Sequence, residues 1–304
     1  MAQPSRIAAS DGDALIGAAA PDGILPVQAI RVLVSAGVLK AAEPLDAGQL
    51  QPASVDLRLG PRAYRVRASF LPGPGGSVAE RLEALKLHTL DLSEGAVLET
   101  GCVYVVPLIE SLALPQAIAA SANPKSSTGR LDVFTRVIAD GVSAFDLVPA
   151  GYAGPLYAEI CPQTFPIIVR KGSKLSQLRF RHGNPRETDE GLLKLQERET
   201  LVSGARADIH DGIALSVDLA GDASGLVGYR ARRHTGVVDV DVKGACAIAD
   251  YWEPVVADAR RLILDPDQFY ILASKEAVHI PPTHAAEMMP FNPLVGEFRV
   301  HYAG

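Results

Sequence analysis

The stretch that decides the fold begins with Asn123-Pro124-Lys125-Ser126-Ser127-Thr128-Gly129-Arg130 and ends at Phe180. Strand-like runs follow at residues 131–139 and 155–160, separated by a turn at residues 149–154. The opening loop carries hydroxyl groups, backbone N–H groups and an Arg, which together suit a phosphate or an oxyanion. An ordinary surface loop would have a similar composition, so the residues by themselves leave both interpretations open.

A single carboxylate, Glu159, interrupts the second strand pattern. A buried carboxylate is costly unless it is paired or used in chemistry. As a general base, Glu159 would activate water and shuttle protons. Alternation of polar and apolar residues does not decide which face Glu159 occupies, so an outward-facing strand residue remains the alternative.

The rest of the chain also favours strands. Period-two patterns occupy residues 53–60 and 63–67, and further strand patterns cover 87–92 and 97–108, with Gly- and Pro-rich turns between them. Residues 26–40 instead have apolar residues at helical spacing and predict a short helix. Short strands at regular spacing predict a mainly β chain, folded as a barrel or a sandwich with a few short helices.

The strand pattern repeats in the second half of the chain. Ser54-Val55-Asp56-Leu57 returns as Ser216-Val217-Asp218-Leu219. Three further matches share one offset of 166 positions: Tyr104/Tyr270 (270 − 104), Glu110/Glu276 (276 − 110) and Pro115/Pro281 (281 − 115). A shared offset predicts two tandem copies of one β domain. When the two copies are aligned, residues 292–297 of the second copy correspond to the Lys125–Arg130 loop of the first. The sequence ends at Gly304, before the position that would correspond to Glu159.

We therefore expect four segments. They are a flexible N-terminus at residues 1–24, a catalytic β domain at 25–183, an amphipathic linker helix within 184–205, and a degenerate, incomplete second β domain at 206–304.

Composition excludes several functional classes. The net charge of −6 argues against a nucleic-acid partner, which needs a clustered basic surface. No apolar run is long enough to span a membrane, and residues 1–20 do not have the pattern of a signal peptide. The cysteines are Cys102, Cys161 and Cys246, far apart and without a CxxC, so we expect a reducing, cytoplasmic location.

The common catalytic motifs are missing from the sequence. A zinc deaminase needs an HxE and a PCxxC, and neither is present, so we expect no zinc. The sequence also lacks a Walker A motif, a GxGxxG fingerprint and a GxSxG elbow.

Four segments in order resemble the dCTP deaminase family of the trimeric dUTPase-like superfamily, in its two-domain bacterial form. The segments are residues 51–60, the Lys125–Arg130 loop, Gly151-Tyr152-Ala153-Gly154 followed by Glu159, and residues 172–180 with Gln177. The resemblance covers about residues 25–183. It implies two tandem dUTPase-like distorted β-barrel, or jelly-roll, domains.

The resemblance also implies zinc-free hydrolysis of dCTP to dUTP and ammonia, for dTTP precursor synthesis. By position, Glu159 would be the general acid and base, and Ser126 and Arg130 would position water and support the tetrahedral intermediate. The other implied contacts are Lys125, Ser127 and Gln177 to phosphate, the backbone along Val137 to Ala139 to cytosine, and Asp146 and Tyr152 to the deoxyribose, with Arg136 as a further substrate-binding residue. Mg²⁺ would arrive with the triphosphate.

The chain departs from the family pattern in three places. Lys125 stands where the family usually has an Arg. The bidentate contact that an Arg guanidinium makes with phosphate is therefore lost, and only the single charge of the ammonium group remains. The Asp that binds the sugar in the family turn is missing, and Asp146 is the candidate to replace it. The C-terminal lid that closes over the nucleotide is not recognisable, and Gly228-Tyr229-Arg230 is only a faint candidate for it. A bifunctional deaminase that releases dUMP, or a nucleotide-binding protein that has lost its chemistry, therefore remain alternatives. A homotrimer is the simplest assembly.

Overall fold

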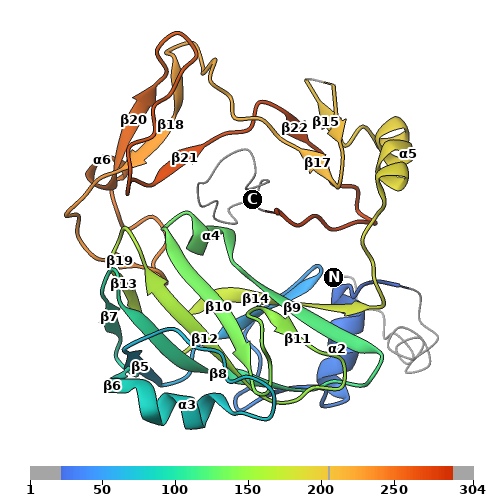
Figure 1. Cartoon of the computed structure of the whole chain (residues 1–304), viewed down its shortest axis with the longest axis vertical. Helices are drawn as coiled ribbons and strands as arrows, with labels where there is room; N and C mark the ends of the chain where they lie inside the picture. The colour runs from blue at the N-terminus through green and yellow to red at the C-terminus, as the bar shows by residue number, and fades with distance from the viewer. Residues whose placement is uncertain (1–21, 205, 290–304) are drawn as a thin grey trace, which may run out of the picture. The chain divides into compact units, whose positions relative to one another are not determined.

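The structure is a computed structural model that describes residues 22–204 and 206–289. Its contacts divide these residues into two compact units. Unit 1 holds residues up to Pro185 together with Val237–Lys243, and unit 2 holds Arg186–Gly236 and the residues from Gly244 onward. Figure 1 labels the elements of both units.

Unit 1 is built mainly from strands. Its elements are β1 (Gly23–Ile24), α2 (Val27–Ser35), β2 (Leu39–Ala41), β3 (Leu50–Gln51), β4 (Ser54–Arg58), β5 (Arg62–Val66), α3 (Val78–Leu85), β6 (Lys86–Asp91), β7 (Ala96–Leu98), β8 (Val103–Ala113), β9 (Ile118–Pro124), α4 (Ser126–Gly129), β10 (Val133–Ala139), β11 (Leu147–Val148), β12 (Ala153–Pro162), β13 (Ile167–Val169), β14 (Lys174–His182) and β19 (Val238–Asp239).

Two sheets form the body of unit 1. The first has the order β11-β9-β14-β4-β3, with β1 beside β14, and the second has the order β10-β12-β8-β5-β6, with β2 beside β8. A smaller sheet joins β19, β13 and β7. The mainly β fold predicted from the strand patterns is confirmed. The helix predicted over residues 26–40 is α2, which buries Ala29, Ile30 and Leu33.

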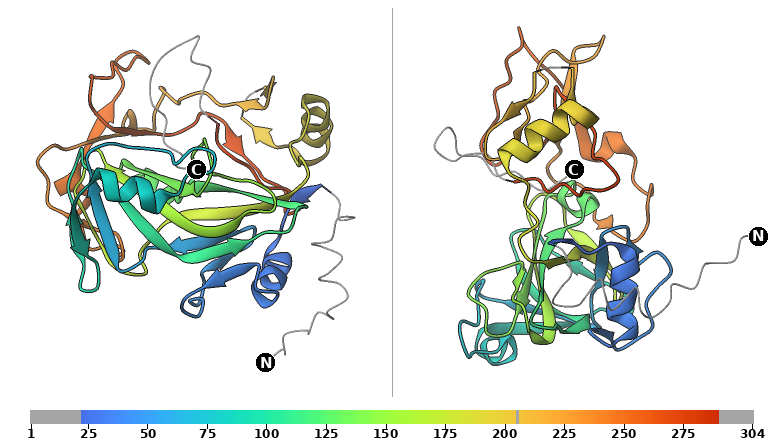
Figure 2. Two further views of the ribbon diagram at one scale, coloured as in Figure 1. Left: turned by 60° about the horizontal axis from the view of Figure 1, so that its bottom comes forward. Right: turned by 90° about the vertical axis from the view of Figure 1, so that its right-hand side faces the viewer.

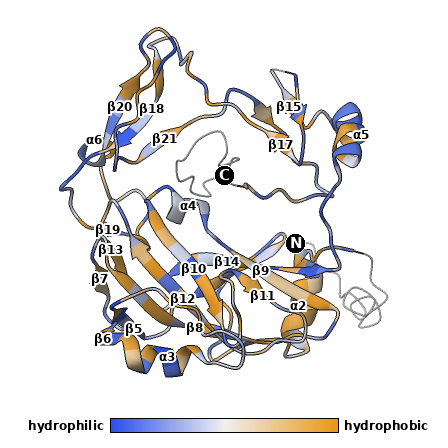
Figure 3. Ribbon diagram, in the orientation of Figure 1, coloured by the Kyte–Doolittle hydropathy of each residue, from blue (hydrophilic) through white to orange (hydrophobic). Residues whose placement is uncertain are grey.

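One hydrophobic core receives side chains from both large sheets. Alternate residues contribute to it, such as Val55 and Leu57 of β4 and Ala158 and Ile160 of β12, and all four are fully buried. In Figure 3, β9 and β10 are largely orange, the colour of hydrophobic residues. Because successive side chains of a strand point to opposite faces, the intervening residues lie on the outer faces of the two sheets.

Helix α3 was not expected from the sequence, although a local signal for it is present. Ser77 caps its N-terminus in a capping box with Glu80. Val78 and Leu82 then pack against Val66 and Val105, on the outer face of the second sheet. Figures 1 and 2 show α2 and α3 on the outside of unit 1.

Tyr152 locks the turn that leads into β12. Its side chain belongs to the hydrophobic core. Its hydroxyl donates a hydrogen bond to the Pro155 carbonyl at 2.5 Å and accepts one from the Asp140 N–H at 3.1 Å. Burial raises the pKa of Tyr152 to about 12.

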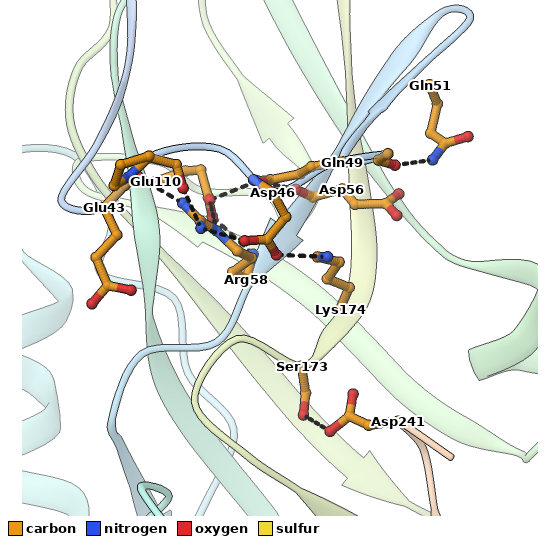
Figure 4. A network of polar contacts seen from close by, with 12 residues as sticks. Glu43, Asp46, Gln49, Gln51, Asp56, Arg58, Glu110, Ser173, Lys174 and Asp241 are labelled. Carbon is orange, nitrogen blue, oxygen red and sulfur yellow. Dashed lines mark hydrogen bonds and ion pairs between the residues drawn. The ribbon is translucent and has the colours of Figure 1, made fainter. Parts of the chain in front are cut away.

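A buried ion pair connects β4 to β8 (Figure 4). The Glu110 carboxylate accepts from Arg58 Nε at 2.7 Å, from the Arg58 backbone N–H at 2.8 Å and from Gln49 Nε2 at 2.8 Å. The side chains of Arg58 and Glu110 are 3% and 0% exposed. The remaining Arg58 nitrogens donate to the carbonyls of Glu43 and Pro44 and to the Asp46 carboxylate. Each charge is therefore compensated inside the protein.

Unit 2 has shorter elements. They are α5 (Asp189–Glu199), β15 (Val202–Ser203), β16 (Asp208–Ile209), β17 (Ile213–Ala214), β18 (Leu226–Ala231), α6 (Ile248–Tyr251), β20 (Trp252–Val256), β21 (Tyr270–Leu272) and β22 (Ala277–Val278). Gly228-Tyr229-Arg230, considered above as a lid, forms the middle of β18 between β20 and β21.

The strand pairing of unit 2 repeats that of unit 1. In unit 1, β5 lies between β6 and β8, and Arg65 is opposite Tyr104. In unit 2, β18 lies between β20 and β21, and Arg230 is opposite Tyr270. Each tyrosine hydroxyl accepts a hydrogen bond, at 3.1 Å, from the backbone N–H of the residue five positions earlier. The two halves therefore share one structural plan, as the offset of 166 positions predicts.

The helix expected as a linker belongs to this repeated plan. In unit 1, α2 leads into β2, where Leu39 pairs with Leu112. In unit 2, α5 leads into β15, where Val202 pairs with Val278. Leu195 of α5 packs with Leu201 and Val202 inside unit 2. Helix α5 is thus the counterpart of α2 and part of the second unit.

The match of Ser54–Leu57 with Ser216–Leu219, proposed from the sequence, is four positions away from the correspondence that the structure shows (58 − 54). Glu276 Oε2 accepts from the Ser216 N–H at 2.8 Å, as Glu110 Oε2 accepts from the Arg58 N–H at 2.8 Å. Ser216 therefore corresponds to Arg58 and not to Ser54. Of the N-terminal segment predicted at residues 1–24, residues 1–21 lie outside the described residues, whereas Gly23–Ile24 form β1 and pair with β14. Residues 292–297 also lie outside the described residues, and the proposed domain boundaries stay a prediction.

We expect Glu110→Ala to lower the free energy of unfolding by about 3–5 kcal/mol, because it leaves the Arg58 guanidinium buried without its carboxylate. Equilibrium urea denaturation followed by circular dichroism measures the loss. Glu276→Ala is the matched control, since the Glu276 carboxylate accepts from the Ser216 backbone N–H, as Glu110 accepts from the Arg58 N–H, and its loss should cost much less than the loss of Glu110. Equal losses would contradict the role given to the Arg58–Glu110 pair.

The second prediction concerns Tyr152 at alkaline pH. An ordinary tyrosine pKa is 10.0 and the folded value is about 12, so the folded state holds the phenol proton more tightly than the unfolded state. The stability from the neutral phenol is fully present below pH 10 and is lost as pH rises through 12. Tyr152→Phe should therefore flatten the alkaline fall of the unfolding free energy, measured by urea denaturation between these pH values. An unchanged slope would refute the assignment.

Candidate functional site

The Lys125–Arg130 loop forms a single helical turn, α4, held against β14. The Lys125 N–H and the Thr128 hydroxyl both donate to the Leu175 carbonyl, at 2.9 and 2.8 Å. Thr128 and Gly129 are buried. This packing fixes the backbone of the loop and leaves Ser126 and Ser127 at the wall of a pocket.

The pocket beside α4 has a volume of about 550 Å³. It is lined by Gln51, Pro52, Ala53, Ser54, Asp56, Lys125, Ser126, Ser127, Gln177, Arg179 and Lys243. We call it the β4–β14 pocket. Ser54 donates a hydrogen bond to Gln177 Oε1 at 2.9 Å, and the Asp56 carboxylate pairs with Lys125. Lys125, Ser127 and Gln177, the residues predicted to contact phosphate, are therefore brought together.

Glu159 lies in a second cluster, on the paired strands β10 and β12. Arg136 is directly opposite Glu159, and its Nη2 lies 2.5 Å from Glu159 Oε1. The Glu159 side chain is only 4% exposed. Its other oxygen, Oε2, is buried and has no hydrogen-bond partner within residues 22–204 and 206–289. The Arg136 guanidinium stacks 3.7 Å from the centroid of the Phe145 ring.

The two clusters lie on opposite outer faces of unit 1. Ser54 and Gln177 alternate with the core residues Val55 and Leu178, so the β4–β14 pocket is on the outer face of the first sheet. Glu159 alternates with core residues of β12, so it is on the outer face of the second sheet. The hydrophobic core separates them. Unit 1 therefore presents two candidate half-sites, the β4–β14 pocket and the Glu159–Arg136 pair, that face different directions.

Arg130 and Ser126 were predicted to act with Glu159. Ser126 lines the β4–β14 pocket beside Lys125 and Ser127. Arg130 is exposed at the C-terminal end of α4. Their catalytic roles stay predictions, and both residues belong to the Lys125–Arg130 loop and not to the strands that carry Glu159.

The hairpin residues predicted to bind cytosine and deoxyribose have structural partners. Asp146 adopts a positive φ of 62°. Its Oδ1 accepts from the Val137 N–H at 2.7 Å, and its own N–H donates to the Val137 carbonyl at 2.8 Å. The Val137 backbone, expected to be free for the cytosine edge, is thus occupied by Asp146 in this chain. Ala139 and Tyr152 are buried in the core, and the role predicted for the Tyr152 ring stays a prediction.

The lining residues of the β4–β14 pocket that the sequence reasoning did not assign to the site include Ser54, Asp56, Arg179 and Lys243. For the first three a signal exists, because period-two alternation places them on one face with Gln177 once the two strands are paired. For Lys243 no local signal exists, since it is 66 positions from Gln177 (243 − 177).

Among the described residues, no group of three or more His, Cys, Asp or Glu side chains is arranged to hold a metal ion. No helix in the same part of the chain has the length and the apolar character needed to cross a bilayer. The three cysteines are free thiols.

Family models match both halves of the chain. The model described as 2'-deoxycytidine 5'-triphosphate deaminase (DCD) N-terminal domain matches residues 21–184, and the model for the DCD C-terminal domain matches residues 188–304. The first match contains both half-sites, apart from Lys243.

Curated relatives match the first half. A protein of Parafrankia sp. named "dCTP deaminase, dUMP-forming" is 32% identical over 160 residues, which are 52% of this chain and 76% of the relative. A protein of Nocardioides sp. with the same name is 32% identical over 171 residues, 56% of this chain and 85% of the relative.

One solved structure matches nearly the whole chain. It is the crystal structure of 2'-deoxycytidine 5'-triphosphate deaminase from Agrobacterium tumefaciens, with 61% sequence identity and a TM-score of 0.89 over 93% of this chain and 86% of that chain. With the phosphate loop, the buried glutamate and the repeated β units in place, these matches show that the chain belongs to the dCTP deaminase family, in its two-domain form.

Proposed function

We propose that this chain deaminates dCTP by hydrolysis at C4 of cytosine, with Glu159 as general base and acid. The observation that carries the proposal is the state of the Glu159 carboxylate. Oε1 is held by Arg136, whereas Oε2 is buried without a hydrogen-bond partner within residues 22–204 and 206–289. A buried carboxylate oxygen left unsatisfied is costly, and a water or a substrate proton would satisfy it.

The proton accounting for this role is simple. Glu159 takes a proton from water as the oxygen attacks C4, and it passes that proton to N3 of the ring. The second proton of the water then leaves with the amino group, which departs as ammonia, and the carboxylate is regenerated. Arg136 holds Oε1 and so directs Oε2 toward the reacting water. Ser126 and Arg130 would support the charge of the tetrahedral intermediate.

The β4–β14 pocket suits the triphosphate. Lys125 and Arg179 supply positive charge, and Ser127 and Gln177 supply hydrogen-bond donors. The carboxylate in the pocket, Asp56, is already paired with Lys125. This donor set fits a Mg²⁺ ion held mainly by the phosphates and not by a protein cage. The ion would neutralise phosphate charge when it is bound with the nucleotide.

The product of the reaction is proposed to be dUMP. The resemblance in the sequence placed dUTP first and the bifunctional reaction second. The curated relatives are named dUMP-forming, which favours the second. The balanced reaction consumes one water to release ammonia and a second water to release pyrophosphate. The cytoplasm, where nucleotide precursors are made, is the proposed location.

The two half-sites require more than one copy of the chain. Glu159 and the β4–β14 pocket face opposite directions, and one nucleotide must reach both. A ring in which each copy offers its Glu159 face to the pocket of the next satisfies every site, and a homotrimer is the proposed closure.

Glu159→Gln should lower kcat for ammonia release from dCTP by about 10²–10⁴-fold, because the amide keeps the shape of the pocket but cannot accept the water proton. Ammonia release and chromatographic separation of dUTP from dUMP measure the reaction and its product together. Glu94→Gln, at an exposed position, is the matched control and should keep wild-type kcat.

Each other outcome has a definite meaning. Tight dCTP binding without ammonia release by the wild type would replace the enzyme with a nucleotide-binding protein. Unchanged kcat in Glu159→Gln would refute the assignment of the base. Accumulation of dUTP without release of pyrophosphate would show that the product is dUTP, as first expected from the sequence, and not dUMP.

Mixing two inactive variants tests the shared site. Gln177→Glu places a negative charge in the β4–β14 pocket and should abolish triphosphate binding by repulsion. If sites form between copies, a mixture of Gln177→Glu and Glu159→Gln chains should recover about one quarter of wild-type activity, the fraction of sites that combine two intact halves under random exchange. The Glu159→Gln, Gln177→Glu double variant mixed with Glu159→Gln is the control and should stay inactive. No recovery after demonstrated subunit exchange would place both halves in one chain.

A further inference from the structure

Residues 237–243, called here the inserted segment, come from the second half of the sequence but belong to unit 1. They lie between β18 and α6 of unit 2. The counterpart connection in the first half runs from Arg67 to Val78, or 11 positions (78 − 67). In the second half it runs from Arg232 to Ile248, or 16 positions (248 − 232). The inserted segment thus falls in a connection that is longer than its repeat predicts.

The inserted segment is bound firmly to unit 1. Its strand β19 pairs in parallel with β13, with Val238 opposite Ile167, and Val238 packs against the core. Asp239 accepts two hydrogen bonds at 2.8 Å from the Arg170 guanidinium, and Asp241 accepts one at 2.6 Å from Ser173. Arg170 holds the pKa of Asp239 below its usual value. A bidentate Arg–carboxylate pair fixes orientation as well as distance.

This docking ends with Lys243 at the wall of the β4–β14 pocket. The Lys243 side chain is exposed. Lys125, the other lysine of the pocket, is engaged with Asp56, so its charge is already partly neutralised by the protein. A triphosphate carries several negative charges and needs more cationic groups than Lys125 and Arg179 to compensate it. Lys243 adds a flexible, strongly hydrated ammonium group that suits such a contact.

We propose that Lys243 is a phosphate-binding residue of the β4–β14 pocket, and that the Arg170–Asp239 clamp positions it there. The choice of dCTP as the natural ligand rests on the proposed function; the contact between Lys243 and a phosphate chain does not. A segment encoded in the second half of the sequence would thereby complete the site of the first half.

Calorimetric titration of the full chain with inorganic tripolyphosphate tests the contact without any need for turnover. Lys243→Ala should raise the Kd about tenfold, as expected for loss of one charge-assisted hydrogen bond at a partly exposed site. Lys243→Arg should keep most of the affinity. Lys40→Ala is the matched control, because Lys40 is an exposed lysine of unit 1 on β2, outside the pocket, and its Kd should stay near the wild-type value.

The clamp is tested by a double-mutant cycle. Asp239→Asn should also weaken tripolyphosphate binding. In the Asp239→Asn background, Lys243→Ala should weaken binding less than it does in the wild type, because both changes act on the same contact. In dCTP kinetics, Lys243→Ala should raise KM and leave kcat within a few-fold of wild type.

Three results would overturn the proposal: an unchanged Kd in Lys243→Ala, an equal loss in Lys40→Ala, or no tripolyphosphate binding by the wild type. A wild-type chain that binds tripolyphosphate through Lys243 but releases no ammonia from dCTP would instead overturn the proposed function and leave the phosphate contact intact.

Discussion

Successive side chains of a β-strand point to opposite faces, and this constraint decides where chemistry can occur in unit 1. Each of the two large sheets packs one face against the shared hydrophobic core. Gln177 and Glu159 alternate with core residues along their strands, so they lie on the outer faces, on opposite sides of the same core. The proposed sharing of one site between two copies of the chain rests on this arrangement of the two faces.

Two buried glutamates show how the surroundings separate structure from function. Glu110 is fully buried, and its oxygens accept three hydrogen bonds from Arg58 and Gln49, so the cost of its burial is compensated within the protein. Glu159 is almost as deeply buried, yet only one of its oxygens is bound, by Arg136. The first carboxylate holds β4 against β8. The second retains hydrogen-bonding capacity that a substrate can use.

The repeated plan explains what unit 2 kept and what it changed. Tyr270 and Glu276 make the same backbone contacts as Tyr104 and Glu110, so the frame of the unit is preserved. Ser216 stands where Arg58 stands in unit 1, and the buried ion pair is lost. The connection between β18 and α6 is longer than its counterpart in the first half, and residues 237–243 within it belong to unit 1, pair with β13 and place Lys243 at the wall of the β4–β14 pocket.

The sequence by itself determined the strand-rich fold, helix α2, the offset of the repeat and the resemblance of the Lys125–Arg130 loop to the loop of the family, because all of these depend on local periodicity and on order along the chain. It also singled out Glu159 as an unusual carboxylate, but not the face on which it lies. Only the tertiary structure decided the face on which Glu159 lies, the burial of Tyr152 and the hydrogen bond from the Val137 N–H to Asp146, since each depends on strand register. It alone placed Lys243, because pairing between β19 and β13 joins residues that are distant in sequence and leaves no local pattern in either.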